Sequence, residues 1–228
     1  MSELANRPTV DSPLTQAEVQ RLLPRVPYIA TWSGEPPVRT RVVRTDWPAR
    51  IAYADEVPHD RDGRGVLWRR ALLQPGRGKP QFGVVHPLRQ RHAMRRLLCQ
   101  VCGSSADRTE QGVLWLLGDD RGDWADWPEE MAATHPPVCL PCAHAAVRLC
   151  PYLRRKFVAV RVRRPEVSGV HGRLYEAFGA ATRASGDVIV RFSDPAINWV
   201  QAFELVMCLR ECTFVDLEAE LTRLRADG

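Results

Sequence analysis

Two pairs of cysteines most constrain how this chain can fold. Cys99 and Cys102 form one C-x-x-C pair, and Cys139 and Cys142 form a second pair after an interval of 36 residues. Two thiolates at this spacing can bind one metal ion from the same side of a tight turn. Two such turns supply four soft sulfur ligands in a tetrahedron, which suits Zn²⁺. The sequence therefore predicts a zinc site that joins two distant segments.

Length and composition are typical of a soluble globular protein. The 228 residues suffice for one large domain or two small ones, and 45% are hydrophobic while 26% are charged. No apolar run approaches the roughly 18 residues that cross a bilayer, and residues 1–13 lack a signal-peptide pattern. We therefore expect a cytoplasmic protein with no membrane partner. Seven cysteines, four of them in pairs, favour metal over disulfides in a reducing compartment.

Positive charge is concentrated on both sides of the cysteine pairs. The chain carries a net charge of +5. Residues 77–108 carry +6 and residues 139–173 carry +7, whereas residues 109–138 between them carry −6. A metal ion that joins the cysteine pairs would bring the two basic segments together, and such surfaces attract polyanions. Only Lys79 and Lys156 of the 32 basic residues are lysines, an arginine bias that resembles the codon usage of a high-GC actinobacterial genome.

Apolar periodicity and turn residues predict an α+β fold with a small antiparallel sheet, a central zinc module and mixed C-terminal helices. The four strands of the small sheet are expected at residues 38–45, 50–54, 65–73 and 81–85. Further strands are expected at residues 112–117, 157–162 and 186–192. Helices are expected at residues 15–23, from Pro87 to the first cysteine pair, and at residues 143–149, 196–209 and 214–225.

These elements group into four regions of the chain. The predicted regions are a disordered tail at residues 1–13, a small-sheet region at 14–86, a zinc-binding module with basic flanks at 87–164, and a C-terminal α/β segment at 165–228. The last boundary is placed at Pro165, because the residue pattern changes there. We expect the C-terminal segment to pack on the rest.

The order of elements around the cysteines resembles the treble-clef family of zinc folds. A knuckle at Cys99 to Gly103 is followed by a candidate hairpin and then by a C-x-x-C pair that leads into a helix. The resemblance covers residues 97–151. It implies that Cys99, Cys102, Cys139 and Cys142 are the ligands of one zinc ion. Four thiolates leave no open position for water, so the implied role of the ion is structural.

Treble clefs include the HNH nucleases, which raises an enzymatic alternative. The resemblance offers His135, just before the second cysteine pair, and His144, on the following helix, as catalytic candidates. The HNH-like pattern is incomplete, because no Asp-His pair lies between Cys102 and Cys139. The chain also lacks the phosphate-loop, dinucleotide and nucleophile-elbow motifs. The sequence therefore favours a protein that is not an enzyme, with a degenerate nuclease or a biosynthetic enzyme as the alternative.

Clusters of basic side chains beside the cysteines are candidates for binding DNA or RNA through phosphates. The candidates are Arg89, Arg91, Arg95, Arg96, Arg154, Arg155, Lys156, Arg161 and Arg163. The alternative is a solvated face, or pairing with the acidic residues of the 119–130 loop. Trp124 and Trp127 in that loop are candidates for contacting a protein partner. Cys150, Cys208 and Cys212 are interpreted as small buried side chains rather than ligands.

The leading hypothesis is a zinc-stabilised binding or regulatory protein that contacts nucleic acid or a nucleoprotein partner. It depends on the two basic segments converging beside the metal. The alternatives are the enzymes described above and a protein-interaction adaptor.

Overall fold

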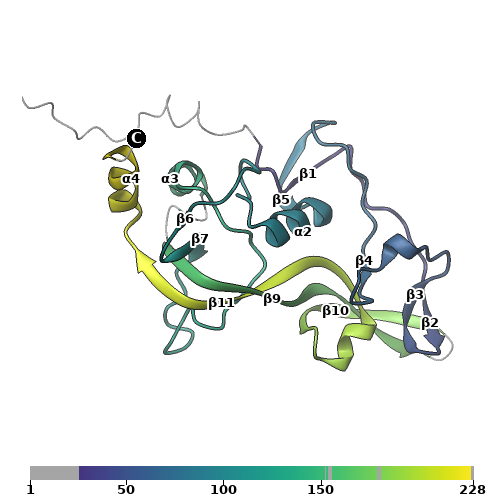
Figure 1. The fold of residues 1–228 in the computed structure, drawn as a ribbon. Helices are drawn as coiled ribbons and strands as arrows, with labels where there is room; N and C mark the ends of the chain where they lie inside the picture. Colours follow the sequence, from purple (N-terminus) through teal and green to yellow (C-terminus); the bar gives the residue numbers. More distant parts are fainter. Residues whose placement is uncertain (1–25, 152, 154–155, 179–180, 227–228) are drawn as a thin grey trace, which may run out of the picture.

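A long twisted β-sheet forms the frame of the computed structural model, which describes residues 26–151, 153, 156–178 and 181–226 (Figure 1). Its strand order is β4-β11-β9-β7-β6, with β10 beside β9 and β8 beside β11. The strands are β4 (Leu67–Trp68), β6 (Arg108–Thr109), β7 (Gly112–Gly118), β8 (Ala132–Ala133), β9 (Phe157–Phe178), β10 (Ala181–Arg191) and β11 (Val200–Val215). Neighbouring strands are antiparallel, except that β4 runs parallel to β11.

Three α-helices pack against this sheet, and two short 3-10 turns complete the described helical elements. The helices are α2 (Pro87–Arg96), α3 (Leu140–Leu149) and α4 (Leu217–Ala226), and the turns are η1 (Pro58–Asp60) and η2 (Pro195–Trp199). None of the helices in the described ranges has the length and apolar character needed to cross a bilayer.

Strand β7 is buried on both faces and so separates two hydrophobic cores. Trp115 belongs to the first core, together with Met94 of α2. Leu114 and Leu116, which point to the opposite face because side chains alternate along a strand, belong to the second core. The second core also receives Leu217 of α4 and residues of α3. This core contains Cys99 and Cys142, so the sheet and two helices enclose the cysteine site.

The N-terminal strands do not form the single small sheet that the sequence predicts. Strands β2 (Val42–Asp46) and β3 (Ala49–Tyr53) pair with each other as a hairpin. Strand β5 (Pro80–Val85) pairs with β1 (Ala30–Trp32), a strand that the sequence analysis missed. Strand β4 joins the large sheet. The segments were identified correctly, but strand partners depend on tertiary packing, which the local pattern does not encode.

The predicted helix at residues 196–209 is wrong, because most of that segment is the central strand β11. A continuous apolar run fits a buried helix and a fully buried strand equally well. Strand β11 lies between β9 on one side and β4 and β8 on the other. A bulge between Ala202 and Glu204 shifts the register, and beyond it Gln90 of α2 bonds to both the N–H and the carbonyl of Leu205, at 3.0 and 2.9 Å. The C-terminal part is therefore dominated by strands rather than by mixed helices.

The last helix begins later than predicted. Phe214 and Val215 still pair with β9 as the end of β11. The Asp216 carboxylate then accepts hydrogen bonds from the N–H groups of Glu218 and Ala219 and so caps α4. Side-chain capping by Asp216 thus sets the start of the helix.

Strand β9 continues through Pro165, where the sequence analysis places a region boundary. Pro165 lies opposite Leu209 of β11. On its other side the pairing with β7 ends at Val162, and the pairing with β10 begins only at Gly169. Because β9 has a neighbour on one side only at this point, a proline is tolerated there. The predicted tail at residues 1–13 and the predicted helix at residues 15–23 lie outside the described residues.

A buried arginine ties α4 to the sheet. Arg161 of β9 has no exposed surface. Its guanidinium lies 2.5 Å from the Asp107 carboxylate and forms a second ion pair with Glu220 of α4. Arg161 therefore neutralises two carboxylates inside the protein.

We expect Arg161→Leu to lower the free energy of unfolding by about 3 kcal/mol, because it leaves the buried Glu220 and the half-buried Asp107 without their cation. Urea unfolding followed by circular dichroism measures this loss. Arg163→Leu is the matched control: it removes an exposed arginine two residues away and should change stability by less than about 0.5 kcal/mol. Equal effects of the two substitutions would contradict this role for Arg161.

Candidate metal centre

The first cysteine pair lies on a tight turn directly after α2. The N–H of Gly103 donates to the carbonyl of Cys99 at 2.8 Å, which closes the turn around Cys102. Gly103 has a φ of +75°, and a Cβ at this position would lie 2.9 Å from the Tyr28 ring. Both the positive φ and the close approach of Tyr28 require glycine here, as the sequence predicts for a knuckle.

The second cysteine pair lies at the start of α3. Cys139 is the N-cap residue of this helix, and Cys142 follows in its first turn. Backbone hydrogen bonds attach this segment to the first pair: the Gln100 N–H donates to the Pro137 carbonyl at 3.0 Å. The N–H of Val138 donates to Leu114 of β7 at 2.9 Å. The predicted helix at residues 143–149 is thus confirmed and begins within the cysteine pair.

The four sulfur atoms meet in one cluster. The sulfur atoms of Cys99, Cys102, Cys139 and Cys142 all lie within 4.8 Å of one another. Cys102 Sγ and Cys139 Sγ are 3.8 Å apart, far beyond a disulfide bond of about 2.05 Å. A tetrahedral ion with metal–sulfur bonds of about 2.3 Å holds its sulfur ligands about 3.8 Å apart. The donor set and its spacing therefore fit one metal ion, as the sequence predicts.

The protons of the cluster are shared unequally. Hydrogen bonds from Cys139 and Cys142 hold the pKa of the Cys99 thiol far below its ordinary value. The pKa of Cys142 is raised, because its thiol donates to Cys139 and Cys99 and is buried. A bound cation would displace the protons of the thiols that it coordinates.

The centre is enclosed rather than open. Cys99 and Cys142 are buried, and Leu140 and Ala143 of α3 surround them together with Leu114 and Leu116 of β7. An ion held by four sulfur atoms in such a core has no free position for a substrate, so its chemical role would be structural.

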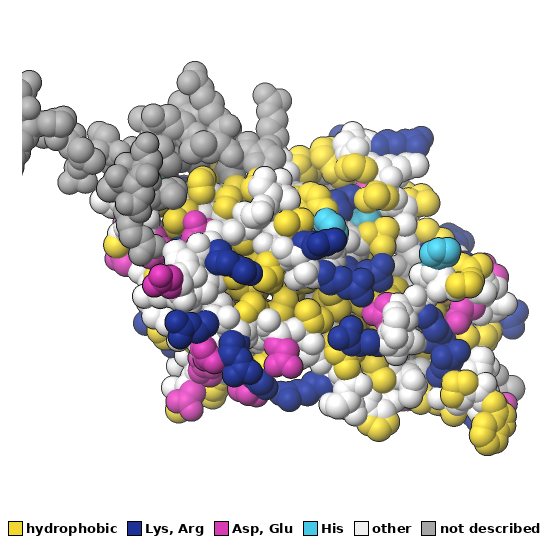
Figure 2. Space-filling model, in the orientation of Figure 1, with side chains coloured by type: hydrophobic (Ala, Val, Ile, Leu, Met, Phe, Trp, Pro, Cys, Tyr) yellow, Lys and Arg dark blue, Asp and Glu magenta, His cyan; other side chains and the backbone are white. Residues whose placement is uncertain are grey.

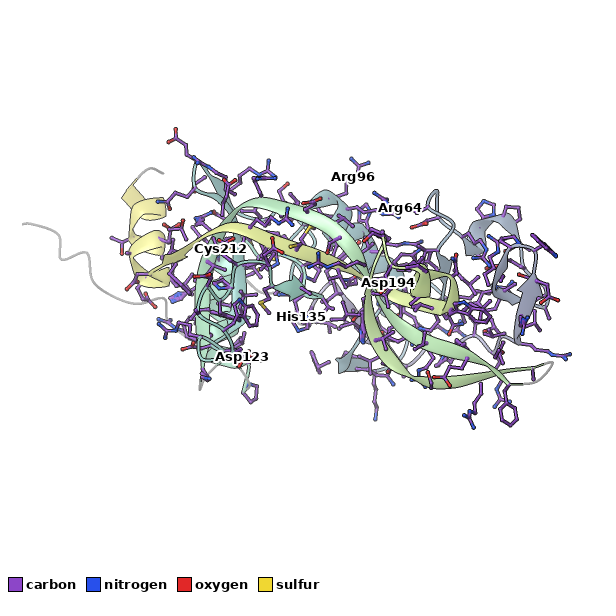
Figure 3. All side chains as sticks on the ribbon, turned by 90° about the horizontal axis from the view of Figure 1, so that it is seen from below. Arg64, Arg96, Asp123, His135, Asp194 and Cys212 are labelled. Atoms are coloured by element: carbon purple, nitrogen blue, oxygen red, sulfur yellow. The ribbon has the colours of Figure 1, made fainter. Side chains whose placement is uncertain are left out.

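The two histidines proposed as catalytic candidates lie in different environments. His135 is exposed, and its carbonyl accepts a hydrogen bond from the indole of Trp115 at 3.0 Å (Figure 3). His144 is buried on α3, with Nε2 at 3.6 Å from the Glu218 carboxylate. A catalytic cation needs ligands that share one solvent-accessible position. The buried His144 side chain does not offer such a position in this structure.

The basic candidates separate into buried and exposed groups. Arg89 is buried and donates to both oxygens of Glu35 at 2.6 and 2.7 Å, and Arg161 is buried in its own ion pairs. Neither side chain faces solvent in this structure, because each neutralises a buried carboxylate. Arg154 and Arg155 lie outside the described residues.

The remaining basic candidates lie on two separate surfaces. Arg95 and Arg96 are exposed on α2, and Arg91 is half-buried beside them. Lys156 and Arg163 are exposed on the other flank, and Lys156 lies 3.9 Å from Asp120 of the acidic loop. Pairing with the acidic loop is thus present on the second flank.

The loop tryptophans also differ from each other. Trp127 is buried and stacks on Phe214, with 6.1 Å between ring centroids. Trp124 is 42% exposed. Trp47 is more exposed: 96% of its side chain faces solvent in the turn of the β2–β3 hairpin.

A buried polar cluster around Glu35, separate from the cysteine cluster, was not predicted from the sequence. Its carboxylate accepts from Arg89 and from the N–H groups of Trp32 and Gln74, both at 2.9 Å. Burial alone would raise the pKa of Glu35, but these hydrogen bonds outweigh it and lower the pKa to about 2. Because 54 residues separate Glu35 from Arg89, no local motif could have revealed the pair.

The comparisons with known proteins give no relative. No family model, curated protein or solved structure matches this chain.

We expect the purified protein to contain one equivalent of a thiophilic divalent metal, measured by elemental analysis. Cys142→Ser should lose the metal and a large part of the thermal stability, because the site and the second core form together. Cys208→Ser, which alters a buried cysteine outside the cluster, should keep the full metal content. Metal-free wild-type protein with unchanged stability would contradict this assignment.

The lowered pKa of Glu35 should make the free energy of unfolding depend on pH. Its lowered pKa in the folded state stabilises the protein above the ordinary pKa of 4.5, and this contribution is lost as the pH falls toward 2. Glu35→Gln should therefore be clearly less stable than wild type at pH 6, and the difference should shrink steadily at lower pH. Urea titrations at several pH values measure it, with the exposed Glu110→Gln as control. A pH-independent difference would contradict the ion pair.

Proposed function

We propose that the metal is zinc and that residues 97–151 form a treble-clef-like module whose ion is structural. Four sulfur donors, with no oxygen or nitrogen ligand in the described cluster, are the set that proteins use for structural zinc. The order of turn, strand pair and helix supports the same proposal: the cysteine turn at residues 99–103 precedes β6 and β7, and α3 carries the second pair. Free thiols are kept reduced in the cytoplasm, which is the setting we propose.

We further propose that the protein binds nucleic acid through a surface beside this module. The α2 basic surface is defined here as Arg64, Arg91, Arg95 and Arg96. Three of these residues lie on the helix that leads directly into the first cysteine turn, and Arg64 lies on the turn before β4. The zinc site would therefore fix the end of the helix that carries the arginines.

Contacts between side chains hold this surface together. The Arg91 guanidinium lies 4.4 Å above the Trp68 ring, and the Arg64 guanidinium lies 4.7 Å above the Phe192 ring. Both arginines remain charged while stacked on aromatic rings, so their charge is held at the surface rather than neutralised. Figure 3 shows Arg64 and Arg96 projecting from the same side of the molecule.

The surface carries more positive than negative charge. Asp62 pairs with Arg95 at 3.3 Å, but among the described residues Arg64, Arg91 and Arg96 form no ion pair. Figure 2 shows basic side chains gathered between α2 and β4 on the face that it draws. Closely spaced arginines of this kind neutralise phosphates and release counterions. Three arginines of this surface, Arg64, Arg91 and Arg96, lack an acidic partner among the described residues, and this observation carries the proposal.

The alternatives have less support. The nuclease alternative takes His135 as the catalytic base and His144 as the ligand of a cation, and His144 is buried. The adaptor alternative relied on Trp124 and Trp127, and Trp127 contributes to the first core instead. Cation-dependent plasmid nicking would favour the nuclease, and nuclease-resistant capture of one protein partner would favour the adaptor.

We expect salt-sensitive binding to a short labelled DNA duplex, measured by fluorescence anisotropy between about 50 and 200 mM salt. The variant Arg95→Gln/Arg96→Gln removes two potential phosphate contacts. It should weaken binding and reduce the slope of log affinity against log salt by about 2.

The variant Arg39→Gln/Arg41→Gln is the matched control, because it removes two exposed arginines ahead of the β2–β3 hairpin, outside the α2 basic surface. It should leave the slope within the error of wild type. Absent binding, salt-independent binding or an equal loss in both double variants would refute the proposal. An RNA strand of matching length, tested in parallel, shows which nucleic acid is preferred.

A further inference from the structure

A pocket distant in sequence from the cysteines combines apolar walls with one arginine that has no acidic partner. It lies between the β1–β5 ribbon, the start of α2 and the segment after β4, and its volume is about 230 Å³. Its lining includes Trp32, Pro36 and Val84 as apolar walls and Thr31, Arg69 and His86 as polar groups. The volume is below the roughly 300–1,000 Å³ of sites for drug-sized ligands, so a fitting ligand is small.

The other charged and titratable groups around the pocket are already engaged. Glu35 is neutralised by Arg89, as described above. Arg70 bonds to Asp60 at 2.7 Å and to Asp55 at 2.9 Å. Arg89 thus compensates the charge of Glu35, whereas Arg70 is shared by two carboxylates, so the group of Arg70, Asp55 and Asp60 carries one net negative charge.

His86 is also committed to the fold. Its Nε2 lies 2.8 Å from the Leu72 carbonyl, to which it donates, and Nδ1 accepts from the Arg89 N–H at 3.4 Å. Burial lowers the pKa of His86, which keeps the ring neutral. A neutral ring with both nitrogen atoms bonded is not a free general base, so the pocket favours binding over acid–base chemistry.

Arg69 is the remaining cation of the pocket. Among the residues that the structure describes it forms no ion pair, and its guanidinium stacks 4.7 Å from the Phe203 ring. The Glu204 carboxylate acts on Arg69 only from beyond ion-pair distance and accepts from His171 Nδ1 at 2.7 Å. The guanidinium is therefore held in place by an aromatic ring with its charge uncompensated.

A buried hydroxyl in the same wall lacks a partner. Thr31 is 7% exposed, and within the described part of the chain its Oγ1 makes no hydrogen bond. Leaving a buried hydroxyl without a partner is unfavourable, and a ligand oxygen that bonds to it would remove this cost. The start of α2 also contributes the positive end of a helix dipole to this wall. All three features select an anionic oxygen.

We propose that this pocket binds a small carboxylic acid with an apolar body. The carboxylate is received by Arg69 and the Thr31 hydroxyl, and the body lies against Trp32, Pro36 and Val84. The apolar walls distinguish this ligand from inorganic phosphate, which has no surface to place against them. The proposal is independent of nucleic-acid binding, because none of these residues belongs to the α2 basic surface.

The test measures binding of three probes to the full-length, metal-loaded protein by calorimetry: benzoate, its neutral analogue benzamide, and inorganic phosphate. Benzoate should bind saturably, and benzamide and phosphate should bind at least about tenfold more weakly, since a charged hydrogen bond is worth roughly 1.5–3 kcal/mol. Equal binding of benzoate and benzamide, tighter binding of phosphate, or no saturable binding of benzoate would refute the proposal.

Three variants separate the pocket from general effects on folding. Arg69→Gln should weaken benzoate about tenfold and leave benzamide nearly unchanged, whereas Val84→Trp should weaken both by filling the space. Thr31→Val should weaken benzoate several-fold without lowering thermal stability, because it removes an unsatisfied hydroxyl. Arg163→Gln, an exposed arginine outside the pocket, should have no effect. Undiminished discrimination between benzoate and benzamide in a folded Arg69→Gln protein would overturn the assignment.

Discussion

The pairing of β9 with β11 is the interaction on which the rest of the structure depends. Their ladder runs from Val200 opposite Leu174 to Val215 opposite Ala159. Strands β7 and β10 attach to β9, and β4 and β8 attach to β11, so each other strand of the large sheet except β6 depends on one of these two. Strand β7, which pairs with β9, contributes side chains to both hydrophobic cores. The β9–β11 ladder therefore supports both cores. The metal-centre segments bond to β7, and β7 joins this ladder through β9.

The metal centre and the cluster around Glu35 differ in how their charges are balanced. At the metal centre, four sulfur atoms gather in an apolar core, and a cation would relieve the mutual repulsion of their thiolates. Around Glu35, the charges of Glu35 and Arg89 are already compensated within the chain, and the nearby Arg69 is not. The first centre therefore favours a structural ion and the second favours an exchangeable anion. The α2 helix touches both, since it begins at the Glu35 cluster and ends beside Cys99.

The arginines of this chain divide into buried ones that stabilise the fold and exposed ones that could bind a partner. In the sequence, nothing distinguishes Arg89 and Arg161 from the other arginines of their basic clusters. In the structure, each forms an ion pair inside the protein with a carboxylate that lies far away in the chain. Desolvating an arginine is costly unless it is paired, so these two serve the fold. Arg91, Arg95 and Arg96 on the same helix as Arg89 are the arginines that the proposed interface uses, and charge counts alone did not separate them from the buried ones.

The sequence by itself determined the four metal-ligand candidates, the glycine of their turn, the helix after Pro87 and the strands at residues 112–117 and 157–162. These features depend on residue chemistry and on periodicity over a few neighbours, which local sequence encodes. Only the tertiary structure decided that residues 200–215 form a strand, that β4 joins the large sheet, and that Glu35 meets Arg89. Such choices depend on burial and on partners far away in the chain, because an apolar run gains the same hydrophobic free energy in a helix or in a strand until its neighbours are fixed.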